Sequence, residues 1–337
     1  MHWIELKAED KIMIQHQELN SGRKDKGFIA RAQGCLLGQL AGDALGSLVE
    51  FQSPEEIKLL YPNGIHELAD GGTWNTIAGQ PTDDSEMALM LARMLVRVGK
   101  YDPNIARIAY LYWLQSKPFD CGRTVSSGLK GYPNHESQAN GALMRISPLG
   151  IFGANYDLEE VAEWARQDAA ITHPHPICQQ TNALFTMAVS QAIHSGCGNQ
   201  ELYEQIEGWS IKMKVDERLI NAVHGAALSP PKDYISQQGW VLIAFHNALW
   251  QLLHSHNLEQ GVVDTVMRGG DTDTNAAICG ALLGAVYGRD AIPDQWLKTL
   301  LNCQPAAGLP QVLRPRPKCF WPVDVLKLAE KLTLFRK

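Results

Sequence analysis

Hydrophobic and polar positions along the chain repeat mainly with the period of an α-helix. Between Met87 and Val98, for example, apolar side chains recur every three or four residues, which places them on one helix face. The sequence contains no convincing pair of strand patterns and no repeat of 20–50 residues. The pattern therefore predicts an all-α protein. Further helix patterns occur at 104–116, 157–170, 177–194, 199–212, 217–225, 236–254, 258–268 and 323–334.

Two predicted helices are unusually rich in small residues. In the first, which begins at Gly27, a glycine recurs every four residues, at Gly34, Gly38, Gly42 and Gly46. The second follows Asp273 and contains Gly280, Gly284 and Gly288. Such spacing leaves a bare stripe against which another helix can approach closely. Asp43 and Glu50 interrupt the first apolar stretch, and an acid there is costly unless it is paired or hydrogen-bonded.

Carboxylates stand in pairs at the start of two predicted helices. Thr82-Asp83-Asp84 precedes one, and Asp271-Thr272-Asp273-Thr274 precedes the small-residue helix. Capping needs one side chain per helix, and adjacent anions repel each other, so a doubly capped helix is the weaker interpretation. Four Asp and two of the three Thr side chains in these clusters would supply hard oxygen ligands of the kind that Mg²⁺ or Mn²⁺ prefers. The two clusters can form such a metal site only if they meet in space, which favours one domain.

Composition excludes several classes of protein. Of the 337 residues, 45 % are hydrophobic and 20 % are charged, so a sizeable core is expected and disorder is not. The formal net charge of −6 argues against a nucleic-acid-binding protein. The seven cysteines form no C-x-x-C pair and indicate reduced thiols of a cytoplasmic protein. The sequence shows neither a signal peptide nor a membrane span.

Three other stretches are candidate site elements. Asp120 is either a helix N-cap or an acid that faces inward. Asn140-Gly141 is expected to open an apolar helix whose backbone N–H groups can hold a phosphate. In His173-Pro174-His175-Pro176, a histidine that donates to a ligand oxygen is favoured over zinc binding, because matching ligands are missing. Residues 1–26 are too apolar for a mere tail, which leaves a packed segment or an arm over a site as alternatives.

Six motifs, in this order between about Gly27 and Lys331, resemble the ADP-ribosylglycohydrolase family. They are G-C-L-L-G-x-x-x-G-D-A-L-G with Glu50, P-T-D-D-S, F-D-x-G-x-T, N-G-A-L-M-R-x-x-P-L-G, T-H-P-H-P and R-G-G-D-T-D-T-N-A-A. The resemblance implies a compact, single-domain, all-α bundle over residues 27–337 with a binuclear Mg²⁺ or Mn²⁺ centre. Residues 1–26 have no counterpart in the shorter members and are treated as a separate N-terminal extension, an arm or lid. Ser85 departs mildly from the family, whose members often have Thr there.

The resemblance also implies roles for individual residues. The metal ligands would be Thr82, Asp83, Asp84, Asp271, Asp273 and Thr274. Glu50 and Asp120 would act around the scissile ribose, and Asp83 and Asp273 are grouped with them as catalytic carboxylates. Substrate contacts would come from Asn140, Gly141, Ala142, Met144 and His173.

The activity that the resemblance implies is metal-dependent hydrolysis of the bond between ADP-ribose and a protein side chain, most plausibly arginine. Asp120 is the first choice for the carboxylate that handles the proton. Glu50 keeps open an O-linked substrate, such as a serine or an ester. A different class is also open: an immunity-type protein that binds and neutralises an ADP-ribosyltransferase through residues 1–26.

Overall fold

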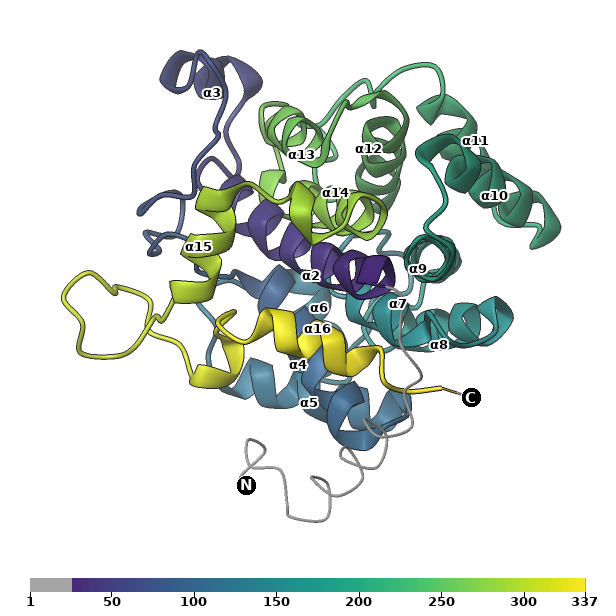
Figure 1. Ribbon diagram of the computed structural model, residues 1–337, viewed down its shortest axis with the longest axis horizontal. Helices are drawn as coiled ribbons and strands as arrows, with labels where there is room; N and C mark the ends of the chain where they lie inside the picture. The colour runs from purple at the N-terminus through teal and green to yellow at the C-terminus, as the bar shows by residue number, and fades with distance from the viewer. Residues whose placement is uncertain (1–25, 337) are drawn as a thin grey trace.

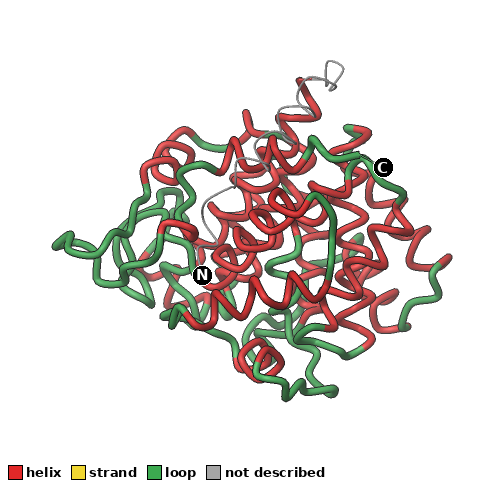
Figure 2. Tube along the Cα trace, turned by 90° about the horizontal axis from the view of Figure 1, so that it is seen from below, coloured by secondary structure: helices red, strands yellow, loops and turns green. Residues whose placement is uncertain are grey.

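The computed structural model describes residues 26–336. In this part of the chain, helices are joined by loops, and there are two isolated β-bridges but no β-strand. Figure 2 shows the long loops gathered mostly at one side of the molecule. The all-α prediction is confirmed. The helices are α2 (Lys26–Gly46), α3 (Pro54–Leu60), α4 (Asp83–Val98), α5 (Pro103–Gln115), α6 (Arg123–Leu129), α7 (Ser147–Gly153), α8 (Leu158–Ala170), α9 (Pro176–Ser195), α10 (Asn199–Lys212), α11 (Glu217–Ala226), α12 (Val241–His254), α13 (Leu258–Val266), α14 (Thr272–Tyr287), α15 (Asp294–Asn302) and α16 (Val325–Leu332), with 3₁₀ turns at Arg289–Ala291 and Lys318–Phe320.

The helices α2 and α14 lie side by side at the centre of the fold (Figure 1). They run antiparallel, because Gly34 faces Gly284 at one end and Gly46 faces Asp273 at the other. A Cβ atom on Gly38 would lie only 2.1 Å from the carbonyl oxygen of Gly280. The bare glycine stripe is therefore confirmed as a close helix contact. It joins the end of α2 to the start of α14.

The remaining helices enclose this central pair. In Figure 1, α12 and α13 lie beyond α14, whereas α4, α7 and α16 lie on the other side of α2. Helix α9 contacts both central helices, and α8 packs against α9. Nearly all buried apolar side chains between residues 26 and 336 belong to one continuous cluster. This core agrees with the predicted single domain.

Two predicted helix starts are wrong, and they share a cause. Residues 140–145 form turns, so the helix expected at Asn140 begins only with α7, and the helix expected from residue 236 begins at Val241. The two loops pair with each other instead. The N–H of Asn140 donates to Gly239 O at 3.0 Å, and the N–H of Val241 donates to Gln138 O at 3.0 Å. Tertiary backbone pairing thus overrides the local helical pattern. The short helices α3 and α15 were not predicted.

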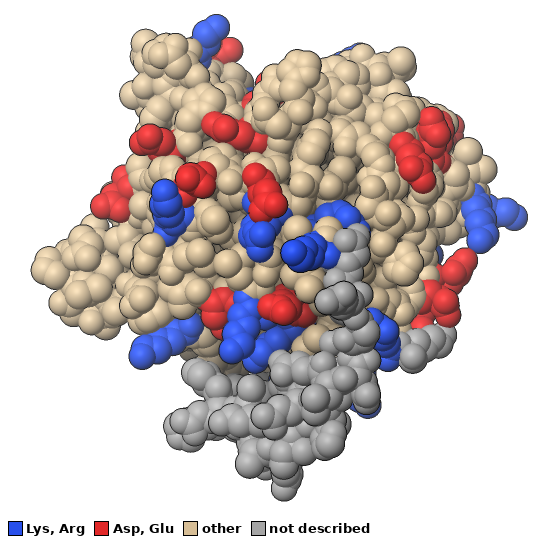
Figure 3. Space-filling model, viewed as in Figure 1, with Lys and Arg blue, Asp and Glu red and all other residues tan. Residues whose placement is uncertain are grey.

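Charges on the surface are mixed in sign. On the face drawn in Figure 3, Lys and Arg side chains lie among Asp and Glu side chains. Arg93 and Asp324, for example, form an ion pair of 2.7 Å. All seven cysteines are free thiols, and six of them are buried. Over residues 26–336, no helix has the length and apolar character that crossing a membrane requires.

Candidate active site

The predicted acids meet in a cavity of about 270 Å³ at the end of α2 and the starts of α4, α6 and α14. It brings together residues from seven separate stretches of the chain. Two predicted site residues, Thr82 and Ala142, are fully buried but do not line it. The predicted residues that do line it are Glu50, Asp83, Asp84, Asp120, Asn140, Gly141, Met144, His173, Asp271, Asp273 and Thr274.

The antiparallel contact between α2 and α14 places Glu50 beside the second acid cluster. The hydroxyl of Thr272 donates to Gly46 O at 2.7 Å. The N–H of Phe51 donates to Gly270 O at 2.8 Å. Gly270 has φ +76°, and a Cβ there would lie 2.2 Å from Tyr234 O, so this position requires glycine. These contacts fix the backbone on which Glu50 and Asp271 stand.

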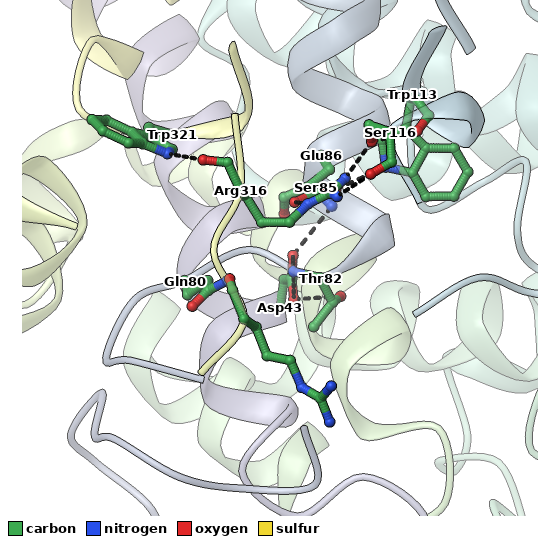
Figure 4. Close-up of polar contacts among 10 residues, drawn as sticks. Asp43, Gln80, Thr82, Ser85, Glu86, Trp113, Ser116, Arg316 and Trp321 are labelled. Atoms are coloured by element: carbon green, nitrogen blue, oxygen red, sulfur yellow. Dashed lines mark hydrogen bonds and ion pairs between the residues drawn. The ribbon is translucent and has the colours of Figure 1, made fainter. Parts of the chain in front are cut away.

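A buried acid from α2 caps the start of α4 (Figure 4). Asp43 accepts the Thr82 hydroxyl at 2.8 Å and the N–H groups of Thr82 and Ser85 at 3.2 and 3.1 Å. The Thr82 side chain makes no capping bond of its own. Asp83 and Asp84 are therefore not needed as caps. The sequence singled out Asp43 as an acid that must be paired, yet it was missing from the predicted site.

A buried ion pair also holds helix α4 (Figure 4). Arg316 donates to both carboxylate oxygens of Glu86, each at 2.7 Å, and to Ser116 Oγ at 2.7 Å. The indole of Trp113 donates to Glu86 Oε2 at 2.8 Å. The pair ties α4 to α5 and to the loop before α16. It anchors the turn that carries Asp83 and Asp84.

Several polar contacts orient the acids of the cavity. The indole of Trp74 donates to Glu50 Oε2 at 2.7 Å, and Asn140 Nδ2 donates to Asp271 Oδ2 at 2.7 Å. Asp120 lies beside Asp83 in the lining of the cavity and so faces inward; the N-cap position of α6 is Gly122. Trp74 was not predicted as a site residue, because it lies in a turn-rich segment without a sequence signal.

The acids share a strongly negative environment. Burial, followed by the charge of Asp271, raises the pKa of Glu50 to about 8. Burial, followed by the charges of Asp83 and Glu50, raises the pKa of Asp120 to about 10. Burial also raises the pKa values of Asp83, Asp84, Asp271 and Asp273, and the charges of neighbouring acids raise those of Asp83, Asp84 and Asp273 further. Among the described residues that line the cavity, only Arg123 carries a permanent positive charge.

The donor set fits a hard divalent cation. Glu50, Asp271 and Asp273 each offer a carboxylate oxygen, and these three oxygens lie within 4.8 Å of one another. Asp84 Oδ1 is buried and has no hydrogen-bond partner among residues 26–336. A cation would stabilise the charged forms of these acids, which burial disfavours. Oxygen donors of this kind suit Mg²⁺ or Mn²⁺ rather than Zn²⁺. Glu50 thus joins a cluster from which the sequence interpretation had left it out.

Comparisons with known proteins agree with this geometry. The ADP-ribosylglycohydrolase family profile matches residues 24–331. The chain is 33 % identical to ADP-ribosyl-[dinitrogen reductase] glycohydrolase of Rhodospirillum rubrum, over 80 % of this chain and 90 % of the relative. It is 26 % identical to ADP-ribosylarginine hydrolase Tri1 of Pseudomonas putida, over 85 % of this chain and 78 % of the relative. A solved structure of an ADP-ribosylglycohydrolase-related protein complex superposes with a TM-score of 0.77 at 26 % identity, covering 93 % of this chain and all of that one. The chain belongs to the ADP-ribosylglycohydrolase family.

Proposed function

We propose that this protein hydrolyses the N-glycosidic bond between ADP-ribose and a protein arginine side chain. One observation carries the proposal: two acid clusters, each at a helix start and far apart in sequence, line one cavity together with Glu50 and Asp120. The relatives include a protein named ADP-ribosylarginine hydrolase. Other relatives are named for ADP-ribose without a linkage, so arginine specificity is part of the proposal.

In the proposed reaction, the residues that line the cavity have separate roles. Glu50, which Trp74 holds in place, faces the ribose that carries the scissile bond. Asp120 lies against Asp83 and gives a proton to the leaving guanidine nitrogen as its bond to the ribose breaks. A water oxygen forms the new bond to the same ribose carbon, and the proton that this water loses restores the one that Asp120 has given up. The Asn140-Gly141 turn and His173 contact the rest of the ADP-ribose.

Divalent cations complete this proposal. The proposed ligands of two Mg²⁺ or Mn²⁺ ions are Asp83, Asp84, Asp271, Asp273 and the Thr274 hydroxyl, which line the cavity, and the Thr82 hydroxyl, which is buried next to them in the chain; the Glu50 carboxylate is within reach. Bound cations would supply the positive charge that orients the ribose hydroxyls and offsets the repulsion between the acids and an anionic ligand.

The test compares substrates and metals directly. Purified protein is incubated with arginine-, serine- and cysteine-linked ADP-ribosyl substrates, with Mn²⁺ and with EDTA. We expect release of ADP-ribose from the arginine substrate, and its loss in EDTA. Asp271→Asn removes one ligand charge yet can still accept from Asn140, so it should abolish activity and keep the fold. Asp294→Asn is the matched control, because Asp294 is an exposed acid in the first turn of α15. Activity in a metal-free preparation, or release from serine only, contradicts the proposal.

A second proposal concerns residues 1–26, which would act either as a lid over the site or as an arm that binds a protein partner. The family match begins at residue 24, so nearly all of this segment lies outside the matched domain, and residues 1–25 lie outside the described part of the chain. Deleting residues 2–25 leaves α2 intact. We expect the deletion to speed hydrolysis of bulky ADP-ribosylated proteins more than of free ADP-ribosylarginine, since a lid obstructs large substrates first. Equal effects on both substrates contradict the lid; unchanged hydrolysis with lost binding of an ADP-ribosyltransferase supports the arm.

A further inference from the structure

His173 presents its two ring nitrogens to different surroundings. The side chain is fully buried, and its ring borders the cavity beside the Asn140-Gly141 turn, where a Cβ on Gly141 would lie 3.3 Å from Nε2. Nδ1 lies 2.7 Å from the Thr172 hydroxyl oxygen. Nε2 has no hydrogen-bond partner anywhere in residues 26–336. One nitrogen is therefore engaged by the fold, and the other is left for a group within the cavity.

The Thr172 hydroxyl must donate to that first nitrogen. Arg145 Nη1 donates to Thr172 Oγ1 at 2.9 Å, and a guanidinium can only donate. If His173 Nδ1 also carried a hydrogen, Thr172 would accept twice. Its own hydrogen would then be buried without an acceptor, since no other described polar atom hydrogen-bonds to this hydroxyl. The arrangement that satisfies every group is Arg145 to Thr172 and Thr172 to His173 Nδ1.

The imidazole is neutral, which fixes the place of its single hydrogen. Burial, followed by the charge of Arg145, lowers the pKa of His173 to about 3. A neutral imidazole whose Nδ1 accepts a hydrogen bond carries its hydrogen on Nε2. The ring therefore turns an N–H donor towards the cavity.

Arg145 itself is held rigidly. Its Nε donates to Asp168 Oδ1 at 3.1 Å, and its Nη2 donates to the carbonyl oxygen of Asp168 at 3.0 Å. The Tyr110 hydroxyl donates to Asp168 Oδ2 at 2.9 Å, and the guanidinium lies 4.3 Å from the centre of the Tyr110 ring. Arg145, Asp168, Thr172 and Tyr110 are all fully buried. The side chains that set the direction of the donor are therefore shielded from bulk solvent.

We propose that Arg145 and Thr172 are positioning residues that keep His173 as an Nε2–H donor, and that this donor selects an oxygen acceptor on the bound ligand. The ligand part rests on the proposed function, since it takes ADP-ribose as the group in the cavity. The cavity is otherwise crowded with carboxylates, which repel phosphate oxygens and accept rather than donate while they are ionised. A histidine locked as a donor supplies the opposite chemistry at the Gly141 side.

The first test observes the ring directly in the full-length protein. Long-range proton–nitrogen NMR spectra of protein labelled with ¹⁵N-histidine distinguish the two neutral tautomers, and His173→Gln assigns the signal. We expect the Nε2–H tautomer in the wild type and in Thr172→Ser. Nδ1–H in the wild type overturns the proposal, whatever reaction the protein catalyses. Because this readout needs neither substrate nor turnover, failure of the relay and failure of the proposed function are distinguishable.

The second test measures binding of ADP-ribose and ADP by calorimetry. Thr172→Val should weaken ADP-ribose binding roughly tenfold, as expected for one lost hydrogen bond, and Thr172→Ser should restore it. Thr186→Val is the matched control, because Thr186 is equally buried and donates only to Asn182 O in its own helix. An equal loss for ADP places the acceptor on the part that the two ligands share, and a loss confined to ADP-ribose places it on the terminal ribose. Unchanged binding of both ligands, or an equal loss in Thr186→Val, overturns the proposal.

Discussion

Replacing Gly38 by alanine tests the central contact of the fold. A methyl group on Gly38 would lie 2.1 Å from the carbonyl oxygen of Gly280, where an ordinary contact begins at 3.4 Å. The obstacle is backbone, which cannot rotate away as a side chain can. The helices cannot pivot either, because a Cβ on Gly34 or Gly42 would meet the backbone of α14 at 2.4 or 2.1 Å. Gly38→Ala therefore has to push α2 and α14 apart by roughly 1 Å.

The expected cost follows from two opposing terms. Overpacking of a well-packed core typically costs about 1–3 kcal/mol, and a backbone clash belongs at the upper end. Alanine gains about 1 kcal/mol over glycine from helix propensity. We expect a net loss of about 2 kcal/mol in the free energy of unfolding. We also expect weaker Mn²⁺ binding, because Glu50 follows α2 whereas Asp271 and Asp273 stand at the start of α14.

Urea unfolding and Mn²⁺ calorimetry measure the two effects. Gly208→Ala is the control, since Gly208 lies in α10 with open space around its Cβ position. That variant should gain up to about 1 kcal/mol of stability and bind Mn²⁺ as the wild type does. If Gly38→Ala is as stable as Gly208→Ala, or binds Mn²⁺ normally, the close contact does not set the geometry of the site.

Three further predictions concern single side chains. Arg316→Met leaves the Glu86 carboxylate buried without its partner, so urea unfolding should show a loss of about 3–5 kcal/mol; a loss below 1 kcal/mol would refute the burial argument. Asp120→Asn should lower kcat on ADP-ribosylarginine about 100-fold or more while calorimetry shows unchanged ADP-ribose affinity; if Glu50→Gln is the more damaging change, the two acids have been assigned the wrong way round. Burial lowers the pKa of His173 from 6.5 to about 3, so below pH 6.5 the unfolded chain takes up a proton that the folded chain does not. As the pH falls, the wild type should therefore lose stability relative to His173→Gln by up to about 1.4 kcal/mol per pH unit. Parallel curves of stability against pH for the two proteins would contradict this.

The sequence predicted the parts of the fold that depend on the order of residues within a single helix. The four-residue glycine repeat of α2 and the small residues of α14 indicated a close helix contact, and the structure contains it. The paired carboxylates at two helix starts indicated a shared site, and both clusters line one cavity. Each inference used a feature that a single helix displays along its own length.

The missed features depend on contacts between distant segments. Trp74 reaches Glu50 only because of the path of a turn-rich loop. Arg316 lies 230 positions from Glu86, and a proline-rich stretch carries no sign that one of its arginines is buried. The false helix start at Asn140 has the same origin, since pairing with the loop before α12 replaces helical hydrogen bonds. Residue spacing cannot encode such pairings.

The acid cluster and the helix contact are parts of one energetic balance. Burying Asp84, Asp271 and Asp273 together raises their pKa values, which means that ionising them opposes folding unless a positive charge is near. The tight contact of α2 with α14 offsets that cost and holds the oxygens at a spacing that suits a cation. A ligand that binds only the folded state adds about 2.7 kcal/mol of stability at one hundred times its Kd. Mn²⁺ should therefore raise the unfolding midpoint of the wild type. If the increase is smaller in Gly38→Ala, the difference measures how far helix packing, rather than the identity of the ligands, determines the affinity of the site for Mn²⁺.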